Sequence, residues 1–161
     1  MEQSHKICCF TGHRKLPAES VPAIKAALES VLDKLIGSGV TVFRTGGALG
    51  FDTLAALAVL EKKASYPEIK LELCLPCRDQ TAKWDKVSVD FYNKILERAD
   101  YVTVLHDRYV DGCMLERNRF MVDGSTYCIA FCKNENAFRS GTSYTVRYAK
   151  SHGVSVINLF R

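Results

Sequence analysis

Short apolar runs alternate along the chain with longer segments in which apolar residues recur every three or four positions. The runs have the length of buried strands, and the longer segments have the period of amphipathic helices. This alternation is typical of a parallel sheet covered by helices. The expected strands are residues 6–10, 40–44, 69–75, 101–105, 126–131 and 154–159.

Helical segments connect these runs. Ser20 is expected to cap the first helix, which ends at Gly37 and Gly39. The others are expected at residues 51–62, over an apolar face of Trp84, Val87, Phe91 and Ile95, around residues 114–122, and from about Gly141 onward. We therefore expect a three-layer α/β/α sandwich with a mostly parallel sheet of about six strands, in a single domain spanning residues 1–161.

The composition excludes several classes of protein. With 161 residues, 47% of them hydrophobic and 25% charged, the chain has the make-up of a globular domain and not of a disordered segment. No run approaches the ~18 apolar residues of a membrane span, and the N-terminus lacks the features of a signal peptide. We therefore expect a cytoplasmic protein with no membrane partner. The formal net charge of +4 is spread without basic runs, which weakens a nucleic-acid interpretation without excluding it.

The seven cysteines are expected to be reduced thiols, because the chain shows no secretion signal. Several lie in or beside expected strands, where a free cysteine behaves as a small apolar residue: Cys8, Cys9, Cys128 and Cys132. Cys74 and Cys77 form a C-x-x-C pair, but Cys74 lies inside a strand and no second ligand pair has zinc-site spacing. No metal and no cofactor is expected.

The segments that follow the strands are the candidates for a site, because ligands of such sheets bind beyond the carboxyl ends of the strands. After the first strand come Gly12, His13 and Arg14. Glycine permits a tight turn, and the planar guanidinium of Arg14 can clamp a phosphate or a carboxylate. The alternative is a turn with a solvated basic residue.

A glycine-rich stretch of the form G-G-x-x-G follows the second strand, so it is not the G-x-G-x-x-G fingerprint of dinucleotide-binding domains. Its backbone N–H groups suit a phosphate at the N-terminus of the next helix, although a tight strand–helix turn is the alternative. Asp52 either caps that helix or accepts a hydrogen bond from a sugar hydroxyl. The candidate residues here are Thr45, Gly46, Gly47, Gly50 and Asp52.

Three further segments complete the candidate site. After the third strand, Gln80 and Trp84 could hold a base or a ribose, although core packing is favoured for Trp84. After the fourth, Arg117 and Asn118 lie on the first turns of a helix, where an arginine can bind phosphate. After the fifth, a helix start rich in hydroxyl groups forms a second anion cradle, made of Ser140, Gly141 and Thr142. Two cradles and two arginines suit a small anionic ligand better than a long polymer.

Together these stretches resemble the SLOG superfamily, which groups the DNA-processing protein DprA/Smf, the Lonely Guy (LOG) phosphoribohydrolases and YspA/YpsA-like proteins. The resemblance is carried by Phe10-Thr11-Gly12-His13-Arg14, Gly46-Gly47-Ala48-Leu49-Gly50-Phe51-Asp52, Met114 with Arg117-Asn118 and Met121, and Ser140-Gly141-Thr142. The G-H-R start points to the YspA/YpsA-like branch. The resemblance implies a Rossmann-like domain that binds a nucleotide or nucleotide-derived ligand through these loops, and it implies a homo-oligomer.

The resemblance also bears on catalysis. In LOG enzymes, an Arg in an M-x-x-R-K stretch and a Glu after P-G-G-x-G-T are linked to cleavage of the N-glycosidic bond of a nucleoside monophosphate. The first stretch is matched from Met114 to Asn118, which makes Arg117 the candidate catalytic residue. No acidic residue follows Gly141 and Thr142, where a carboxylate is expected to stabilise a developing sugar cation. Glu116 and Asp52 are the nearest substitutes.

Three functions follow from these residues. The first is a sensor or regulator that binds a nucleotide-derived small molecule, which the intact cradles and the missing carboxylate favour. The second is a LOG-like phosphoribohydrolase with a rearranged acid/base set, so whether the chain is an enzyme stays open. The third is DprA-like binding of single-stranded DNA, which ranks last because the net charge is only +4 and the chain has one Trp.

Overall fold

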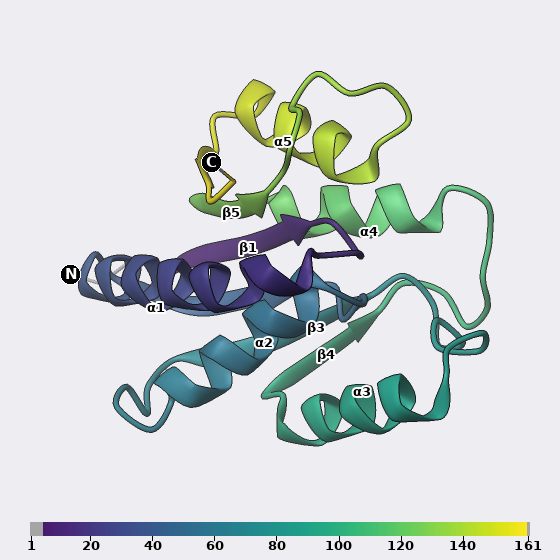
Figure 1. Ribbon diagram of the computed structural model, residues 1–161, viewed down its shortest axis with the longest axis horizontal. Coiled ribbons are helices and arrows are strands. Elements are labelled where there is room, and N and C mark those ends of the chain that lie inside the picture. Colours follow the sequence, from purple (N-terminus) through teal and green to yellow (C-terminus); the bar gives the residue numbers. More distant parts are fainter. Residues whose placement is uncertain (1–4, 161) are drawn as a thin grey trace.

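Six strands form one sheet in the order β4-β3-β2-β1-β5-β6 in the computed structural model, which describes residues 5–160 (Figure 1). Every pairing between neighbouring strands is parallel, which confirms the predicted α/β class. The strands are β1 (Lys6–Gly12), β2 (Val40–Thr45), β3 (Lys70–Leu75), β4 (Tyr101–Val104), β5 (Tyr127–Phe131) and β6 (Ser155–Asn158). Each lies where its apolar run predicts it.

Helices cover both faces of the sheet and complete the three layers. A short 3-10 turn, η1 (Ala18–Ser20), leads into the first of them. The first face carries α1 (Val21–Gly37), α2 (Phe51–Lys62) and α3 (Lys86–Arg98), and the second carries α4 (Cys113–Val122) and α5 (Gly141–Ser151) (Figure 1). The change of face follows from the connections. The chain steps outward from β1 to β4 and then returns past β1 to β5, and right-handed crossovers in opposite directions place their helices on opposite faces.

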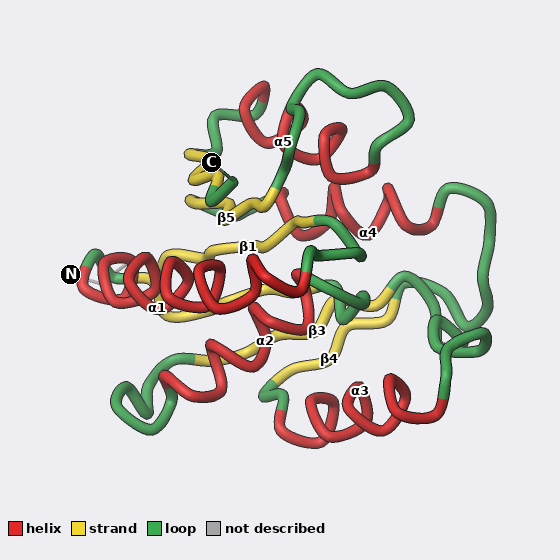
Figure 2. The backbone as a smooth tube through the Cα atoms, viewed as in Figure 1, coloured by secondary structure: helices red, strands yellow, loops and turns green. Residues whose placement is uncertain are grey.

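The reversal of direction lies between β1 and β5, which is the topological switch point of the sheet. Because all strands are parallel, the loops that follow them gather at the carboxyl ends of the strands, on the right in Figure 2. This end of the sheet is where an open α/β sheet binds its ligands. The predicted candidate segments therefore come together in space.

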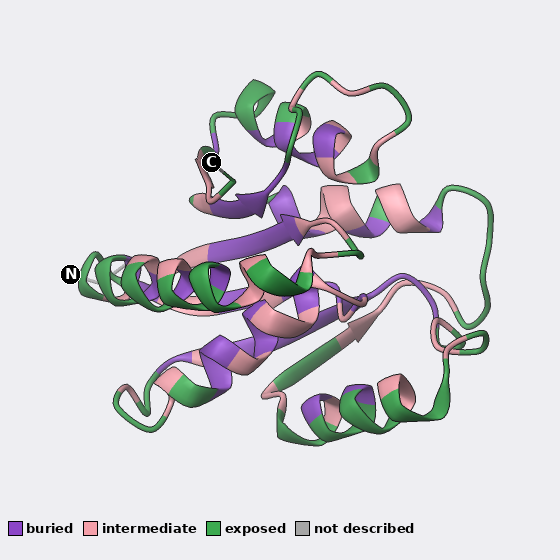
Figure 3. Ribbon diagram, viewed as in Figure 1, coloured by how far each residue is buried: buried purple, intermediate pink, exposed green. Residues whose placement is uncertain are grey.

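The core fills both sides of the sheet, and the central strands are its most buried part (Figure 3). Phe10, Phe43 and Phe51 pack between the sheet and the first helix layer, while Met121 and Cys128 pack under the second. All seven cysteines are buried free thiols, as the sequence predicts. Within the described residues, no helix is both long and apolar enough to cross a membrane.

The apolar face predicted for α3 is wrong in two of its four residues, whereas Ile95 is buried and Trp84 packs against the core as predicted. Val87 and Phe91 are 67% and 48% exposed, and Trp84 precedes the helix. The helix packs instead through Tyr92 and Ile95. It lies at the sheet edge against α2, so only a narrow stripe of its surface finds a partner. The edge strand β4 beside it is also largely exposed (Figure 3).

Candidate functional site

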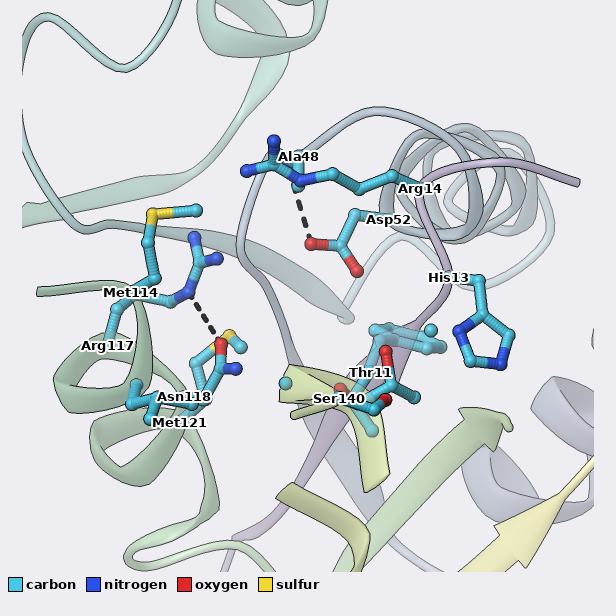
Figure 4. A pocket seen from close by; sticks show the side chains of 15 residues that line it. Thr11, His13, Arg14, Ala48, Asp52, Met114, Arg117, Asn118, Met121 and Ser140 are labelled. Carbon is cyan, nitrogen blue, oxygen red and sulfur yellow. Dashed lines mark hydrogen bonds between the residues drawn. The ribbon is translucent and has the colours of Figure 1, made fainter. Parts of the chain in front are cut away.

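A cavity of about 330 Å³ lies at the carboxyl end of β1, between the N-termini of α2, α4 and α5 (Figure 4). Its walls come from four segments that are far apart in the sequence. The predicted site residues that line it are Gly12, His13, Arg14, Asp52, Arg117, Asn118, Ser140, Gly141 and Thr142. Most of the residues predicted from their position after a strand therefore lie around one cavity.

Arg117 is the most buried cation of this cavity, with only 3% of its surface exposed. Its Nη1 donates to the carbonyl oxygens of Gly46 at 2.6 Å and Cys74 at 3.2 Å, and its Nε donates to Oδ1 of Asn118 at 2.9 Å. No acceptor among residues 5–160 bonds its Nη2 group. The guanidinium points into the cavity toward Asp52 (Figure 4). Arg117 therefore anchors the glycine-rich loop and still offers donors to a ligand.

Asp52 brings a carboxylate to the cavity, although it is only 6% exposed. It does not cap α2, whose N-cap is Gly50, but accepts from the backbone N–H of Ala48 at 3.3 Å. Burial raises the pKa of Asp52 to about 6, against the opposing effect of Arg117. A carboxyl with this pKa gains or loses its proton near pH 6, in mildly acidic solution. Glu116, the other acidic candidate, pairs with His106 and does not line the cavity.

His13 links the loops that follow β1 and β5. Its Nε2 accepts from the backbone N–H of Lys133 at 3.0 Å, so the neutral ring carries its proton on Nδ1. Partial burial, with the nearby charge of Lys133, lowers the pKa of His13, which favours this neutral form. Arg14, the next residue, is exposed at the rim and makes no side-chain hydrogen bond within the described part of the chain.

The N-terminus of α5 forms the opposite wall. The helix begins at Gly141, as the sequence predicts, and Ser140 is its N-cap, whose Oγ accepts from the backbone N–H of Ser143 at 3.1 Å. The N–H groups of Gly141 and Thr142 belong to the first helical turn, where no intrahelical acceptor exists. A helix N-terminus also carries a partial positive charge. Both features suit an anion in the cavity.

The remaining predicted residues lie behind the cavity wall. Thr45 donates through Oγ1 to the carbonyl oxygen of Asp52 at 3.2 Å, and Nε2 of Gln80 donates to the carbonyl oxygen of Gly46 at 3.3 Å. A Cβ on Gly46 would lie 2.4 Å from Nη1 of Arg117, so its missing side chain allows the arginine to approach. The members of this supporting layer, none of which lines the cavity, are Thr45, Gly46, Gly47, Gly50 and Gln80.

Sequence reasoning did not select six residues that line the cavity: Phe10, Thr11, Ala48, Met114, Leu115 and Met121. A signal for part of this set exists. Met114, Arg117, Asn118 and Met121 are spaced i, i+3, i+4 and i+7, which places them on one face of α4. Once Arg117 is a candidate, the two methionines follow from helical geometry.

The comparisons with known proteins agree with this architecture. A family model described as the YspA SLOG family matches residues 3–159. The chain belongs to the YspA SLOG family. This confirms the resemblance to the SLOG superfamily and to its YspA/YpsA-like branch.

Relatives of this YspA SLOG protein occur in bacilli. A UPF0398 protein of Bacillus pumilus is 28% identical over 91% of this chain and 83% of its own length. A UPF0398 protein of Brevibacillus brevis is 30% identical over 83% of this chain and 70% of its own.

Two solved structures share the fold. One is a structure of DNA processing protein A from Helicobacter pylori, which was solved to study how that protein binds single-stranded DNA. It superposes with a TM-score of 0.62 at 18% identity over 94% of this chain. The chain spans 63% of that protein, less than two thirds of its length. TM1055, a structural genomics target, superposes with a TM-score of 0.57 at 15% identity, over 94% of this chain and 72% of its own. At these identities the likeness concerns the Rossmann-like fold alone.

Proposed function

We propose that this protein is a sensor or regulator that binds a nucleotide or nucleotide-derived small molecule in the cavity at the end of β1. The observation that carries the proposal is the convergence of Arg117, whose Nη2 has no partner among the described residues, with the N-terminus of α5 on one cavity. The cavity volume of about 330 Å³ is at the lower end of the range of small-molecule sites.

The parts of the ligand have complementary places in this proposal. The N–H groups of Gly141 and Thr142, together with Arg117, hold a phosphate. Arg14 closes the rim with a second positive charge. Asp52, when ionised, accepts hydrogen bonds from sugar hydroxyls.

The expected homo-oligomer, which rests on the resemblance alone, is tested by sedimentation of the purified chain.

Nucleotides should raise the melting temperature of the protein. A ligand at 100 times its Kd stabilises the native state by about 2.7 kcal/mol, which raises Tm by about 5–11 °C in a chain of this size. Arg14→Ala should weaken binding about tenfold or more, because a charge-assisted hydrogen bond is lost. The measurement is differential scanning fluorimetry with nucleoside mono-, di- and triphosphates.

Arg98→Ala serves as the matched control, since Arg98 is an exposed arginine at the end of α3 that lines no part of the cavity. It should leave every ligand-induced shift unchanged. A panel of nucleotides without any shift would contradict the proposal. If labelled single-stranded DNA then bound with a steep salt dependence, DprA-like binding would take its place.

The raised pKa of Asp52 supports a second candidate, a phosphoribohydrolase. In this function the N-glycosidic bond breaks, the protonated carboxyl of Asp52 acts as general acid and donates its proton to the leaving base, and a water molecule adds to the sugar carbon. Free base should then appear from nucleoside monophosphates, and its rate of release should fall as the pH rises above about 6. The measurement is chromatography of the released base.

Asp52→Asn should abolish this release, whereas Glu116→Gln should leave it unchanged because Glu116 lies outside the cavity. Release that persists in Asp52→Asn would remove the role of Asp52. Absence of free base with every nucleoside monophosphate would leave ligand binding as the function.

A further inference from the structure

A second and larger cavity adjoins the first. Its volume is about 740 Å³, and it shares Arg14 and Met114 with the first cavity. It lies under the loops that follow β3 and β4, and its walls include Trp84, Tyr109 and Gln80. We propose that it is the subsite for the base of the ligand, which stacks on Trp84 and Tyr109 while the phosphate-bearing part lies in the first cavity. This inference rests on the proposed function.

The two cavities differ in the chemistry they offer. Arg117, Asp52 and the N-terminus of α5 give the first one groups that suit a phosphate and sugar hydroxyls. The second has the side chains of Trp84 and Tyr109 in its wall, and aromatic rings of this kind stack on the planar face of any base. A molecule with one anionic part and one planar part matches both cavities at once.

Arg14 stands at the junction of the two cavities. It is exposed, and its guanidinium is engaged by no hydrogen bond or ion pair among residues 5–160. A positive charge at this position faces the part of the ligand that joins phosphate to base. A ligand confined to the first cavity would leave the larger cavity and its two rings unused.

The Trp84 ring and the backbone that carries Tyr109 are held in place before any ligand arrives. Trp84 packs edge-on against Tyr92, with 5.5 Å between ring centroids. The backbone N–H of Tyr109 donates to Oδ1 of Asp79 at 3.0 Å, and the N–H of Arg78 donates to the carbonyl oxygen of His106 at 3.1 Å. These bonds tie the loop after β3 to the loop after β4. A wall fixed in this way loses little conformational entropy on binding.

Gln80 adds a polar group to the wall of the second cavity. Its Nε2 donates to the carbonyl oxygen of Gly46, which fixes the orientation of the amide because a flipped amide would set two oxygens against each other. Its Oε1 is buried and has no donor among the described residues. Buried acceptors normally have a partner, and the N–H edge of a base is a donor of the required kind.

Trp84 is the chain's one tryptophan, so its fluorescence reports on the second cavity directly. Ribose 5-phosphate and the four mononucleotides AMP, GMP, CMP and UMP are titrated while Tm and tryptophan emission are measured. We expect ribose 5-phosphate to raise Tm without changing the emission, and at least one mononucleotide to change both.

Tyr109→Ala should weaken binding of that mononucleotide about tenfold, within the usual cost of a lost stack, and change binding of ribose 5-phosphate less than about twofold. Tyr109 is 59% exposed and uses only its backbone N–H to hold Asp79, so the variant should fold. Tyr101→Ala is the matched control, because Tyr101 is a 52% exposed tyrosine that lines neither cavity.

The two proposals fail in different ways. A mononucleotide that raises Tm while tryptophan emission stays constant and Tyr109→Ala binds it like the wild type would overturn the base subsite and keep the first cavity. No change in Tm with ribose 5-phosphate, with the four mononucleotides or with the di- and triphosphates of the nucleotide panel would overturn both.

Discussion

Gly50→Ala should lower the free energy of unfolding by about 3 kcal/mol or more, through backbone strain and overpacking together. Gly50 has φ 78° and ψ −120°, a mirror-β conformation that side chains disfavour. A Cβ built there would lie 2.2 Å from the carbonyl oxygen of Arg14 and 2.6 Å from that of His13. The carbonyl oxygen of His13 also accepts a hydrogen bond from the backbone N–H of Phe51 at 3.1 Å. The loop that contains His13 and Arg14 therefore cannot move away from the new Cβ without losing this bond.

The expected fall in Tm is about 6–12 °C, measured by thermal and urea unfolding. Gly153→Ala is the matched control, because Gly153 has φ 75° but no atom within 4 Å of a built Cβ. It isolates the strain of a positive φ and should cost about 1–2 kcal/mol. If both variants lost the same stability, the proposed clash with the loop after β1 would be absent.

Much of the fold could be predicted because burial imposes a period on the sequence. Buried strands are rich in apolar and β-branched residues, and the segments at β2 and β3 predicted these strands to within a residue. The boundaries of α2 matched the prediction at both ends, since Gly50 and the charged residues after Leu60 mark them. The pattern could not show that α3 lies at the edge of the sheet, where Val87 and Phe91 stay exposed.

Most residues around the cavity could be predicted because the topology sets where ligand-binding loops gather. The role of each residue could not be predicted, because it depends on the direction in which each side chain and carbonyl group points. Gly46 was predicted to approach a phosphate, yet its carbonyl oxygen is turned toward Arg117 and Gln80. The position of Asp52 against Arg117 joins residues 65 positions apart, and no local pattern records it.

The charge balance of the cavity rests on Arg117 and Asp52. Burial opposes both charges: it lowers the pKa of Arg117 and raises the pKa of Asp52, and each charge partly offsets the burial of the other. Because the pKa of Asp52 rises from 3.8 to about 6 on folding, its favourable contribution to stability is complete below pH 3.8 and is lost as the pH rises through 6. The ionised carboxylate of Asp52 therefore makes the folded protein less stable at neutral pH than in acid.

Arg117→Met should lower the free energy of unfolding by about 3–5 kcal/mol at pH 7.5, the usual cost of leaving a buried charge uncompensated. The carbonyl oxygens of Gly46 and Cys74 lose a donor, and the carboxylate of Asp52 loses the positive charge that most lowers its pKa. The pKa of Asp52 should then rise further. The destabilisation should accordingly be larger at pH 7.5 than at pH 4, measured by urea unfolding at both values.

Asp52→Asn should restore part of this loss when combined with Arg117→Met, because it removes the uncompensated carboxylate. The double variant should regain at least about 1 kcal/mol over Arg117→Met at pH 7.5 and less at pH 4, where Asp52 is already protonated in the folded state. Arg119→Met is the control on the same helix, since the one hydrogen bond that the side chain of Arg119 makes with residues 5–160 goes to the hydroxyl of Tyr144. Equal losses from Arg117→Met at both pH values, with no recovery in the double variant, would show that Arg117 acts through its hydrogen bonds alone.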